Sequence, residues 1–365
     1  MEILSSLILS RLRGLSQAQA ISLLRYYGTA EAALSDEAPE CERWGLLLRD
    51  KAGLRIARER ALQEREFCEQ HQVRIIPFSS NEYPLLLKAD EIPDAPVNLF
   101  YRGTGRLGRR YVLSVVGTRH ITDYGKQVCE SLFADLGRLL PDLLVVSGLA
   151  YGVDIHAHRA SLANGLDTVA VLAHGHDRIY PRMHQATAEE MTRCGGLLTE
   201  YFTDTVPDKG NFVRRNRIVA GISSGTLVIE SAGKGGALIT ATIAGSYNRE
   251  VMAVPGRLGD YYSEGCNRLI RDNRASLVLS AEDVLRTLGW EAAPAKAAKE
   301  PTLFPLYTPE QERVLDALGQ ADSLSVDQLS IQTGLSVSAL TELLFDLEDS
   351  ESVVRMPGNR IRLHG

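Results

Sequence analysis

The amino-acid sequence predicts an α/β protein: a doubly wound, parallel, Rossmann-like sheet with a helical region before it and a winged helix after it. Seven short apolar runs alternate with helix-compatible stretches, which is typical of parallel strands that are buried on both faces. These runs are 111–116, 143–147, 168–173, 196–201, 225–230, 250–255 and 275–279. After them, residues 306–365 show three helical patterns and a hairpin, which is the order of elements in a winged helix.

Residues 1–68 are expected to form an N-terminal helical domain. Apolar residues recur at helical spacing from Leu4 to Leu12, and Ser16 is placed to cap the helix that follows. Gly28 then interrupts the pattern before another helix. This order of helix, glycine-containing turn and helix is typical of helix-hairpin-helix or SAM-like domains. Such hairpins grip a phosphate backbone in some proteins and are as often plain helical packing.

The rest of the chain divides into three parts. Residues 69–290 are expected to form the α/β domain, in which two strand-like runs precede the seven already named. Residues 291–305 are rich in Ala, Pro and charged side chains, as in a linker. Residues 306–365 are the predicted winged helix. Its helices are expected at 309–318, 325–333 and 337–347, and its hairpin strands at 352–356 and 360–363, around Pro357-Gly358-Asn359.

Composition excludes several classes of protein. The 365 residues hold 40 Lys+Arg and 46 Asp+Glu, a net charge of −6, which excludes a protein that coats nucleic acid by charge alone. Residues 291–365 carry 6 basic and 12 acidic side chains, so the tail is a separate acidic unit. No apolar run reaches the ~18 residues that span a bilayer, and the N-terminus lacks a basic n-region. We therefore expect no membrane partner and a cytoplasmic protein.

The sequence predicts no metal, no cofactor and no enzymatic activity. The five cysteines are scattered and include no C-x-x-C, so they indicate reduced thiols and no zinc site. There is no G-x-G-x-x-G for a dinucleotide, and Val228 stands where a P-loop needs glycine before Gly233-Lys234. H-E-x-x-H and G-x-S-x-G are also absent. The sequence has several turns of the kind that bind phosphate but no recognisable set of catalytic residues. This favours binding of a polyanion over catalysis.

Those turns follow the predicted strands, where ligands of such sheets bind. The first strand leads into Thr118 and Arg119, which offer a hydroxyl and a guanidinium to an anion. The second ends at Ser147-Gly148, before a helix that Asp154 is placed to cap. A third turn brings Gly235 and Gly236 to the start of another helix, whose free N–H groups favour a phosphate.

A basic segment follows the fourth strand of the seven. Basic side chains around an aromatic ring suit single-stranded nucleic acid, because they supply charge for phosphates and a ring for a base. The alternative, equally supported by this segment alone, is a solvated helix start with Phe212 in the core. The candidate DNA-binding residues here are Lys209, Phe212, Arg214, Arg215, Asn216 and Arg217.

Six runs together resemble the DNA-processing protein A (DprA/Smf) family of bacterial recombination mediators. They follow one another in family order through the whole α/β region. Val153 stands where the family often has Ile, and Val213 where Pro commonly follows Phe. The runs are 114–119 (SVVGTR), 146–158 (VSGLAYGVDIHAH), 212–221 (FVRRNRIVAG), 235–241 (GGALITA), 251–256 (VMAVPG) and 265–270 (GCNRLI).

The resemblance implies single-stranded DNA binding, protection of incoming DNA and loading of the RecA recombinase during natural transformation. It implies that Arg119 holds a phosphate, that Ser147 and Gly148 supply hydroxyl and amide contacts, and that Phe212 stacks against a base. Asn216 would contact the DNA backbone or brace the loop. It also implies a homodimer through the α/β domain, for which we expect residues 265–279 to form the contact. The groove itself would be lined by Lys209, Arg214, Arg215 and Arg217.

Two other functions are less favoured. Lysine-decarboxylase-like phosphoribohydrolases, which cleave nucleoside monophosphates, carry P-G-G-x-G-T-x-x-E. Residues 225–230 match only its last part, because Ser223-Ser224 stand where the Pro-Gly-Gly would be. A winged-helix transcription factor is the other alternative, and the acidic tail opposes it because duplex binding needs phosphate neutralisation.

Overall fold

The computed structural model describes residues 1–36, 41–293, 307–319, 321, 323–349, 352–356 and 360–363. The chain forms two compact units, Met1–Pro294 and Ala295–Gly365. The predicted linker falls mostly outside the described residues. In the described part of the chain, no helix is both long and apolar enough to span a membrane.

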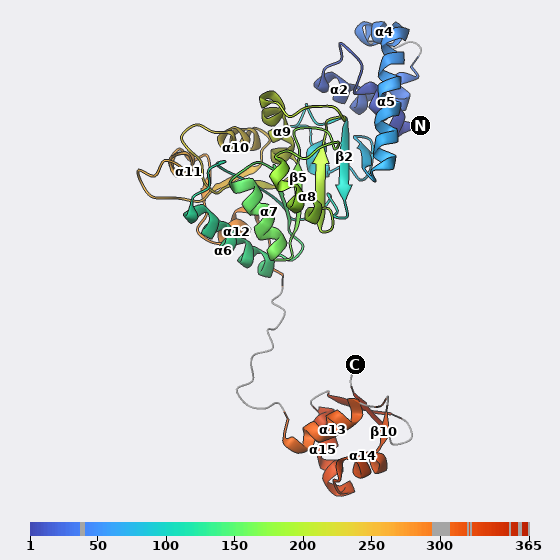
Figure 1. Ribbon diagram of the computed structural model, residues 1–365, viewed down its shortest axis with the longest axis vertical. Helices are drawn as coiled ribbons and strands as arrows, with labels where there is room; N and C mark the ends of the chain where they lie inside the picture. Colours follow the sequence, from blue (N-terminus) through green and yellow to red (C-terminus); the bar gives the residue numbers. More distant parts are fainter. Residues whose placement is uncertain are drawn as a thin grey trace. The chain divides into compact units, whose positions relative to one another are not determined.

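A nine-stranded sheet forms the centre of the first unit (Figure 1). Its order is β1-β2-β6-β5-β4-β3-β7-β8-β9. The strands from β6 to β9 in this order run parallel, while β2 pairs antiparallel with β6 and β1 antiparallel with β2. The doubly wound parallel sheet is therefore confirmed, with an antiparallel extension at one edge. The strands are Arg74–Pro77 (β1), Asn98–Gly103 (β2), Val112–Val116 (β3), Leu144–Ser147 (β4), Asp167–Val171 (β5), Gly195–Thr199 (β6), Gly225–Val228 (β7), Glu250–Ala253 (β8) and Ser276–Leu277 (β9).

Alternating side chains give the sheet two buried faces. Along β3, Val112 and Val116 enter one core with α9 and α10, while Leu113 and Val115 enter a second core with α6, α7 and α12. Helices therefore cover both faces, as near-continuously apolar strands require. The helices are Asp123–Leu139 (α6), Val153–Ala163 (α7), Gln185–Met191 (α8), Lys209–Gly221 (α9), Gly236–Ser246 (α10), Glu264–Arg271 (α11) and Ala281–Leu288 (α12), with short 3₁₀ turns at Leu85–Lys88 (η1) and Arg182–His184 (η2).

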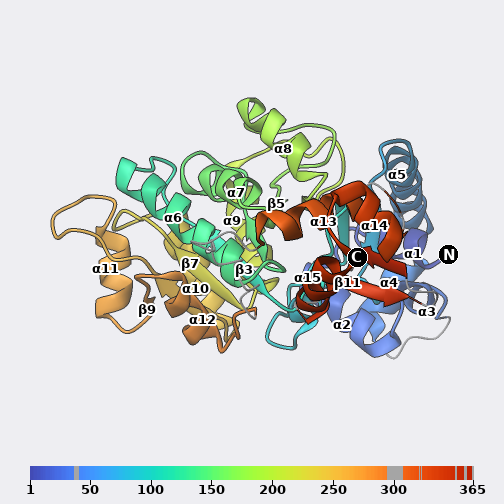
Figure 2. The same cartoon turned by 90° about the horizontal axis from the view of Figure 1, so that it is seen from below.

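The N-terminal helices pack beside the β1–β2 edge, at the end of the unit opposite α11 and β9 (Figures 1 and 2). Ser16 caps the second helix in a capping box, as predicted. Leu7 and Trp44 belong to the same buried core as β2, and Asn98 of β2 donates from Nδ2 to the Ser6 carbonyl at 2.9 Å. Whether residues 1–68 fold by themselves stays a prediction. The helices are Glu2–Leu9 (α1), Gln17–Tyr27 (α2), Ala30–Leu34 (α3), Glu42–Arg49 (α4) and Lys51–Gln70 (α5).

The second unit is a winged helix, as predicted. Three helices enclose a small core in which Leu329, Leu340 and Leu344 are fully buried, and a three-stranded sheet closes it. The predicted hairpin turn Pro357-Gly358-Asn359 lies outside the described residues. The elements are Pro309–Gly319 (α13), Leu324–Ser325 (β10), Val326–Thr333 (α14), Val337–Asp349 (α15), Val353–Met356 (β11) and Arg360–Leu363 (β12).

Candidate nucleic-acid interface

A cleft of about 710 Å³ opens beyond the carboxyl ends of β3, β4 and β7. The chain order reverses between β3 and β7, and sheets of this type bind ligands at such a switch point. The cleft brings together nine of the predicted site residues from four parts of the chain. They are Thr118, Arg119, Gly148, Lys209, Phe212, Arg215, Asn216, Gly235 and Gly236.

The Phe212 ring is the aromatic centre of the cleft. The Arg119 guanidinium carbon lies 5.2 Å from the ring centroid and that of Arg215 lies 5.9 Å from it. The ring of Tyr180, which sequence reasoning missed, is 5.9 Å away. Phe212 is half-buried and lines the cleft, so it is neither a core side chain nor a fully exposed one. Because cations hold it in place, part of the ring remains available to a base.

Three cations at the cleft have no counter-ion. In the described part of the chain, the exposed side chains of Arg119, Lys209 and Lys234 make no hydrogen bond or ion pair. The turn that carries Arg119 is fixed by Thr118, whose N–H donates to the Glu230 carbonyl at 2.7 Å and whose Oγ1 accepts from the His120 N–H at 3.1 Å. Exposed, unpaired cations on a fixed turn form a site for a strong anion.

The N-terminus of α10 adds backbone donors to the same cleft. Gly235 is its N-cap residue and supplies no side-chain cap, so the first N–H groups of the helix lack that partner. Gly235 and Gly236 are exposed and line the cleft. A helix of 11 residues places partial positive charge here, beside Lys234.

Arg215 supports the floor of the cleft and is not an exposed phosphate ligand. It is 5% exposed, and its Nη1 donates to the Val171 carbonyl. Burial lowers the pKa of Arg215 and raises that of Asp154, and each charge opposes the effect of burial on the other. The pair packs onto Gly148, where a Cβ atom would collide with both side chains. The predicted groove-lining role of Arg215 is therefore corrected to a positioning role.

His158 fixes the same turn from the other side. This fully buried ring places Nε2 at 2.5 Å from the Gly148 carbonyl and Nδ1 at 2.6 Å from Thr168 Oγ1. Burial lowers the pKa of His158 to about 4, so the ring is neutral at physiological pH and its Nε2–H is the donor to the carbonyl. The Gly148 backbone is thereby held open towards the cleft.

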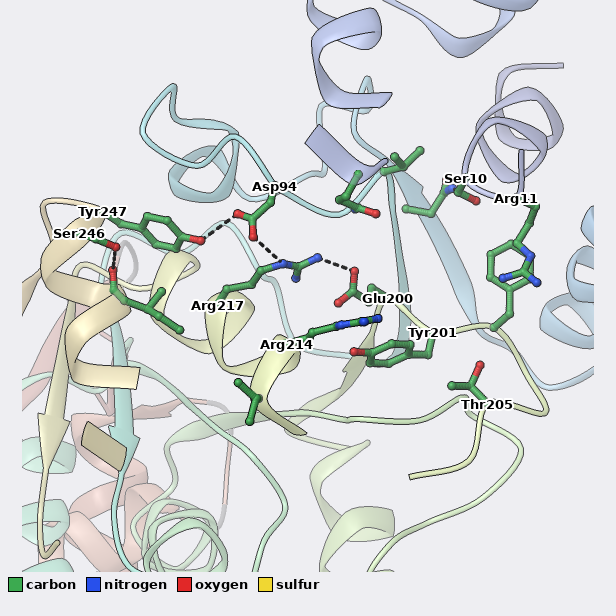
Figure 3. Close-up of a pocket in the computed structure, with 16 residues that line it drawn as sticks. Ser10, Arg11, Asp94, Glu200, Tyr201, Thr205, Arg214, Arg217, Ser246 and Tyr247 are labelled. Carbon is green, nitrogen blue, oxygen red and sulfur yellow. Dashed lines mark hydrogen bonds and ion pairs between the residues drawn. The ribbon is translucent and has the colours of Figure 1, made fainter. Parts of the chain in front are cut away.

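Three predicted site residues lie outside the cleft. Ser147 is fully buried and donates from Oγ to the Val115 carbonyl at 2.6 Å, which leaves no hydroxyl for DNA. Arg217 pairs with Glu200 at 2.6 Å and Asp94 at 3.2 Å, with 11% of its side chain exposed. Arg214 is exposed beside a second pocket (Figure 3). The single groove predicted for Lys209, Arg214, Arg215 and Arg217 needs correction, because α9 directs Lys209 and Arg215 to the cleft and Arg214 and Arg217 to the second pocket.

Glu230 follows β7 and is 2% exposed. Its carboxylate accepts from the Thr122 N–H at 2.9 Å and from Thr122 Oγ1 at 2.5 Å, at the start of α6. In a phosphoribohydrolase the corresponding glutamate would act on a ribose. Here the Glu230 carboxylate instead accepts hydrogen bonds from Thr122 and fixes the start of α6. His120, Tyr180 and Lys234 line the cleft and were not selected from the sequence. His120 follows a strand and Lys234 lies in a glycine turn, which were the available signals, whereas Tyr180 lies in the segment between β5 and η2 and had no such signal.

Comparison with known proteins identifies the family of this chain. The DNA recombination-mediator protein A family matches residues 74–289, and the DprA winged helix domain matches residues 291–359. The DNA processing protein DprA of Bacillus subtilis is 41% identical over 219 residues, 59% of this chain and 71% of the relative. The crystal structure of DNA processing protein A from Streptococcus pneumoniae has a TM-score of 0.65 at 32% identity and covers 78% of this chain and 98% of its own.

A second solved structure concerns DNA processing protein A from Helicobacter pylori and describes a single-stranded DNA binding mode. It has a TM-score of 0.53 at 28% identity and covers 60% of this chain and 95% of its own. The matched family model covers more than half of this chain, and the second unit matches the family's own winged helix. This chain therefore belongs to the DNA recombination-mediator protein A family, DprA/Smf.

Proposed function

We propose that this chain binds single-stranded DNA in the cleft between β3, α9 and α10. The observation that supports it most is the arrangement of unpaired Arg119, Lys209 and Lys234 around the half-buried ring of Phe212. Charge for phosphates and a ring face for an unpaired base are the two requirements of single-strand binding. A duplex offers no free base face. The solved structure of the Helicobacter pylori relative, which concerns its single-stranded DNA binding mode, supports the same assignment.

We propose further that the protein is a recombination mediator in the cytoplasm. In this role it protects incoming single strands and loads RecA during natural transformation. Membership of the family supports these roles. We propose no catalytic activity, because Glu230 is occupied by Thr122. An assay for hydrolysis of nucleoside monophosphates tests this, and release of free base would contradict it.

The direct test of the DNA site is Arg119→Ala in the full chain. The exposed guanidinium acts on phosphates, so the variant should bind every single-stranded sequence more weakly by a similar factor. The slope of log affinity against log salt should become shallower by about 0.7. Fluorescence anisotropy titrations at several salt concentrations measure both quantities. Arg49→Ala, an equal charge change on the exposed end of α4, is the control. Wild-type binding by Arg119→Ala would refute the proposed site.

The winged helix should contribute little to single-strand affinity. Its α15, at the position of a recognition helix, has no Lys or Arg and exposes Glu342 and Asp346. In the wing, Arg355 pairs with Glu348 at 2.8 Å. Removal of residues 295–365 should therefore change single-strand affinity by less than about threefold. The comparison is an anisotropy titration of both proteins at equal salt. A loss larger than about tenfold would place part of the DNA site in this unit.

We propose a homodimer through the β9 end of the sheet. Within the expected contact region 265–279, Leu269 is 4% exposed and belongs to the core. Within the same region, Leu277 and Leu279 are 44% and 75% exposed at the edge strand β9. Exposed apolar side chains on an unpaired edge favour association with a second copy.

Leu279→Asp should therefore shift the protein to the monomer in sedimentation velocity. The charge would be buried at the interface, whereas Leu85→Asp changes a similarly exposed leucine in η1, outside residues 265–279, and should leave the dimer intact. Identical sedimentation of Leu279→Asp and wild type, or a monomeric wild type, would contradict the proposed interface.

A further inference from the structure

A second pocket of about 580 Å³ lies against the side of α9 that carries Arg214 and Arg217 (Figure 3). Its walls come from the end of α1, the segment before β2, the segment after β6, α9 and α10. We call it the arginine pocket. Its lining includes Arg11, Tyr201, Phe202, Arg214 and Arg217.

The lining of the arginine pocket holds three arginines and two carboxylates, so its net charge is +1. Glu200 and Asp94 both pair with Arg217, and Asp94 also accepts from the Tyr247 hydroxyl at 2.9 Å (Figure 3). The other two arginines of the pocket are exposed, and in the described part of the chain neither makes a side-chain hydrogen bond or ion pair. The charge that remains to be satisfied in this pocket is therefore positive.

The Arg11 guanidinium packs on the Phe202 ring, where a bound anion would stabilise its positive charge. Its guanidinium carbon lies 5.2 Å from the centroid of the Phe202 ring, and that of Arg60 lies 5.1 Å from the same centroid. Arg60 is satisfied by Glu64 at 2.9 Å and by the Thr203 carbonyl at 2.8 Å. In the described part of the chain, the Arg11 side chain makes no hydrogen bond or ion pair, and desolvation together with the nearby Arg60 charge lowers its pKa although the Glu64 charge opposes them. A bound anion would offset both effects.

Arg214 lies on the opposite wall and connects the arginine pocket to the cleft. It follows Val213, which lines both cavities and is 42% exposed, and it lies five residues after Lys209 of the cleft. At 1.5 Å per residue, these two cations lie about 7.5 Å apart along the helix axis. An exposed path with cations at both ends thus crosses the first turns of α9.

We propose that the arginine pocket receives the phosphodiester backbone of the same single strand after it crosses α9, with Arg11 and Arg214 as phosphate contacts. This extends the proposed function and rests on it. The planar guanidinium groups suit phosphate oxygens, and the Tyr201 ring lines the pocket between the two walls. The N-terminal helices would then carry part of the DNA path, through Arg11 at the end of α1.

The experiment compares oligothymidylates of about 6 and about 20 nucleotides, because the shorter strand fills the cleft alone. In the full chain, Arg11→Ala should weaken binding of the longer strand roughly tenfold and leave the shorter strand unchanged. The salt slope for the longer strand should fall by about 0.7. Arg11→Lys keeps the charge and should retain most of the affinity. Arg49→Ala is the matched control in the same region.

The outcomes separate the two proposals. If Arg119→Ala weakens both strands while Arg11→Ala binds both like wild type, the arginine pocket is not part of the path and the cleft stands. If Arg119→Ala has no effect on either strand, the proposed function itself fails. If Arg11→Lys loses as much affinity as Arg11→Ala, with an equal loss of melting temperature, packing on Phe202 explains the effect and the pocket proposal is overturned.

Discussion

Arg217→Ala should lower the free energy of unfolding of the first unit by about 3 kcal/mol. Arg217 and Glu200 are 11% and 12% exposed, so removal of the guanidinium leaves a mostly buried carboxylate without its charge partner. Asp94, 41% exposed, is still solvated and is therefore affected less. Burial lowers the pKa of Arg217, but the charges of Glu200 and Asp94 outweigh it and the net shift of that pKa is upward. Denaturant unfolding of residues 1–294 measures the change.

Two variants make this result specific. Arg214→Ala removes an exposed neighbour without a partner in the described structure and should stay within about 0.5 kcal/mol of wild type. Arg217→Met combined with Glu200→Gln should recover much of the stability, because the mostly buried unpaired carboxylate is removed and Asp94, 41% exposed, stays solvated. A single variant Arg217→Ala as stable as wild type would show that the Glu200 carboxylate is solvated in the folded protein.

Phe212→Ala should weaken single-strand binding by roughly 1–3 kcal/mol without changing the salt slope. The ring lies between Arg119 and Tyr180 in the cleft, so its loss removes a stacking surface and no charge. Its effect therefore differs in kind from that of Arg119→Ala, which changes the slope. The measurement is again a titration of affinity against salt concentration.

Phe212→Tyr is the control, since it keeps the ring and should bind nearly as well as wild type. The melting temperature separates stacking from packing: half-buried Phe212 should contribute far less to stability than a core ring, whose deletion costs about 3–5 kcal/mol. If Phe212→Ala lowers both the affinity and the melting temperature, and the melting temperature falls as far as it does when a core ring is deleted, the ring stabilises the fold and its loss of affinity is not due to stacking.

The strands and most of the cleft could be predicted from the sequence because both depend on local pattern. Apolar runs of strand length locate the sheet, and parallel strands bring their following residues to one edge. Thr118, Arg119, Gly148 and Gly235 were found in this way, and the structure brings them together in one cleft. What these residues bind is not shown by their position and is the subject of the proposed experiments.

The predictions that the structure corrects depend on contacts between distant parts of the chain. Arg217 resembles a groove residue in the sequence, but its partners Glu200 and Asp94 lie 17 and 123 positions away, and no local pattern joins them. Ser147 was assigned a free hydroxyl, yet β3 lies beside its strand and accepts the hydrogen bond through Val115. The apolar residues Ile218 and Val219 of α9, which are buried, indicate which side of the helix faces the sheet. This pattern could have shown which of its arginines are exposed.

The clamping of α9 also has a kinetic consequence. Its Arg217 is tied to two separate segments by ion pairs and its Arg215 to β5 by a hydrogen bond, so the helix cannot shift without breaking them. The cleft is therefore preformed, and little binding free energy is consumed in ordering the protein. Association should then proceed at a rate set by diffusion and electrostatic steering, and variants of the stacking ring should differ mainly in how long the strand stays bound.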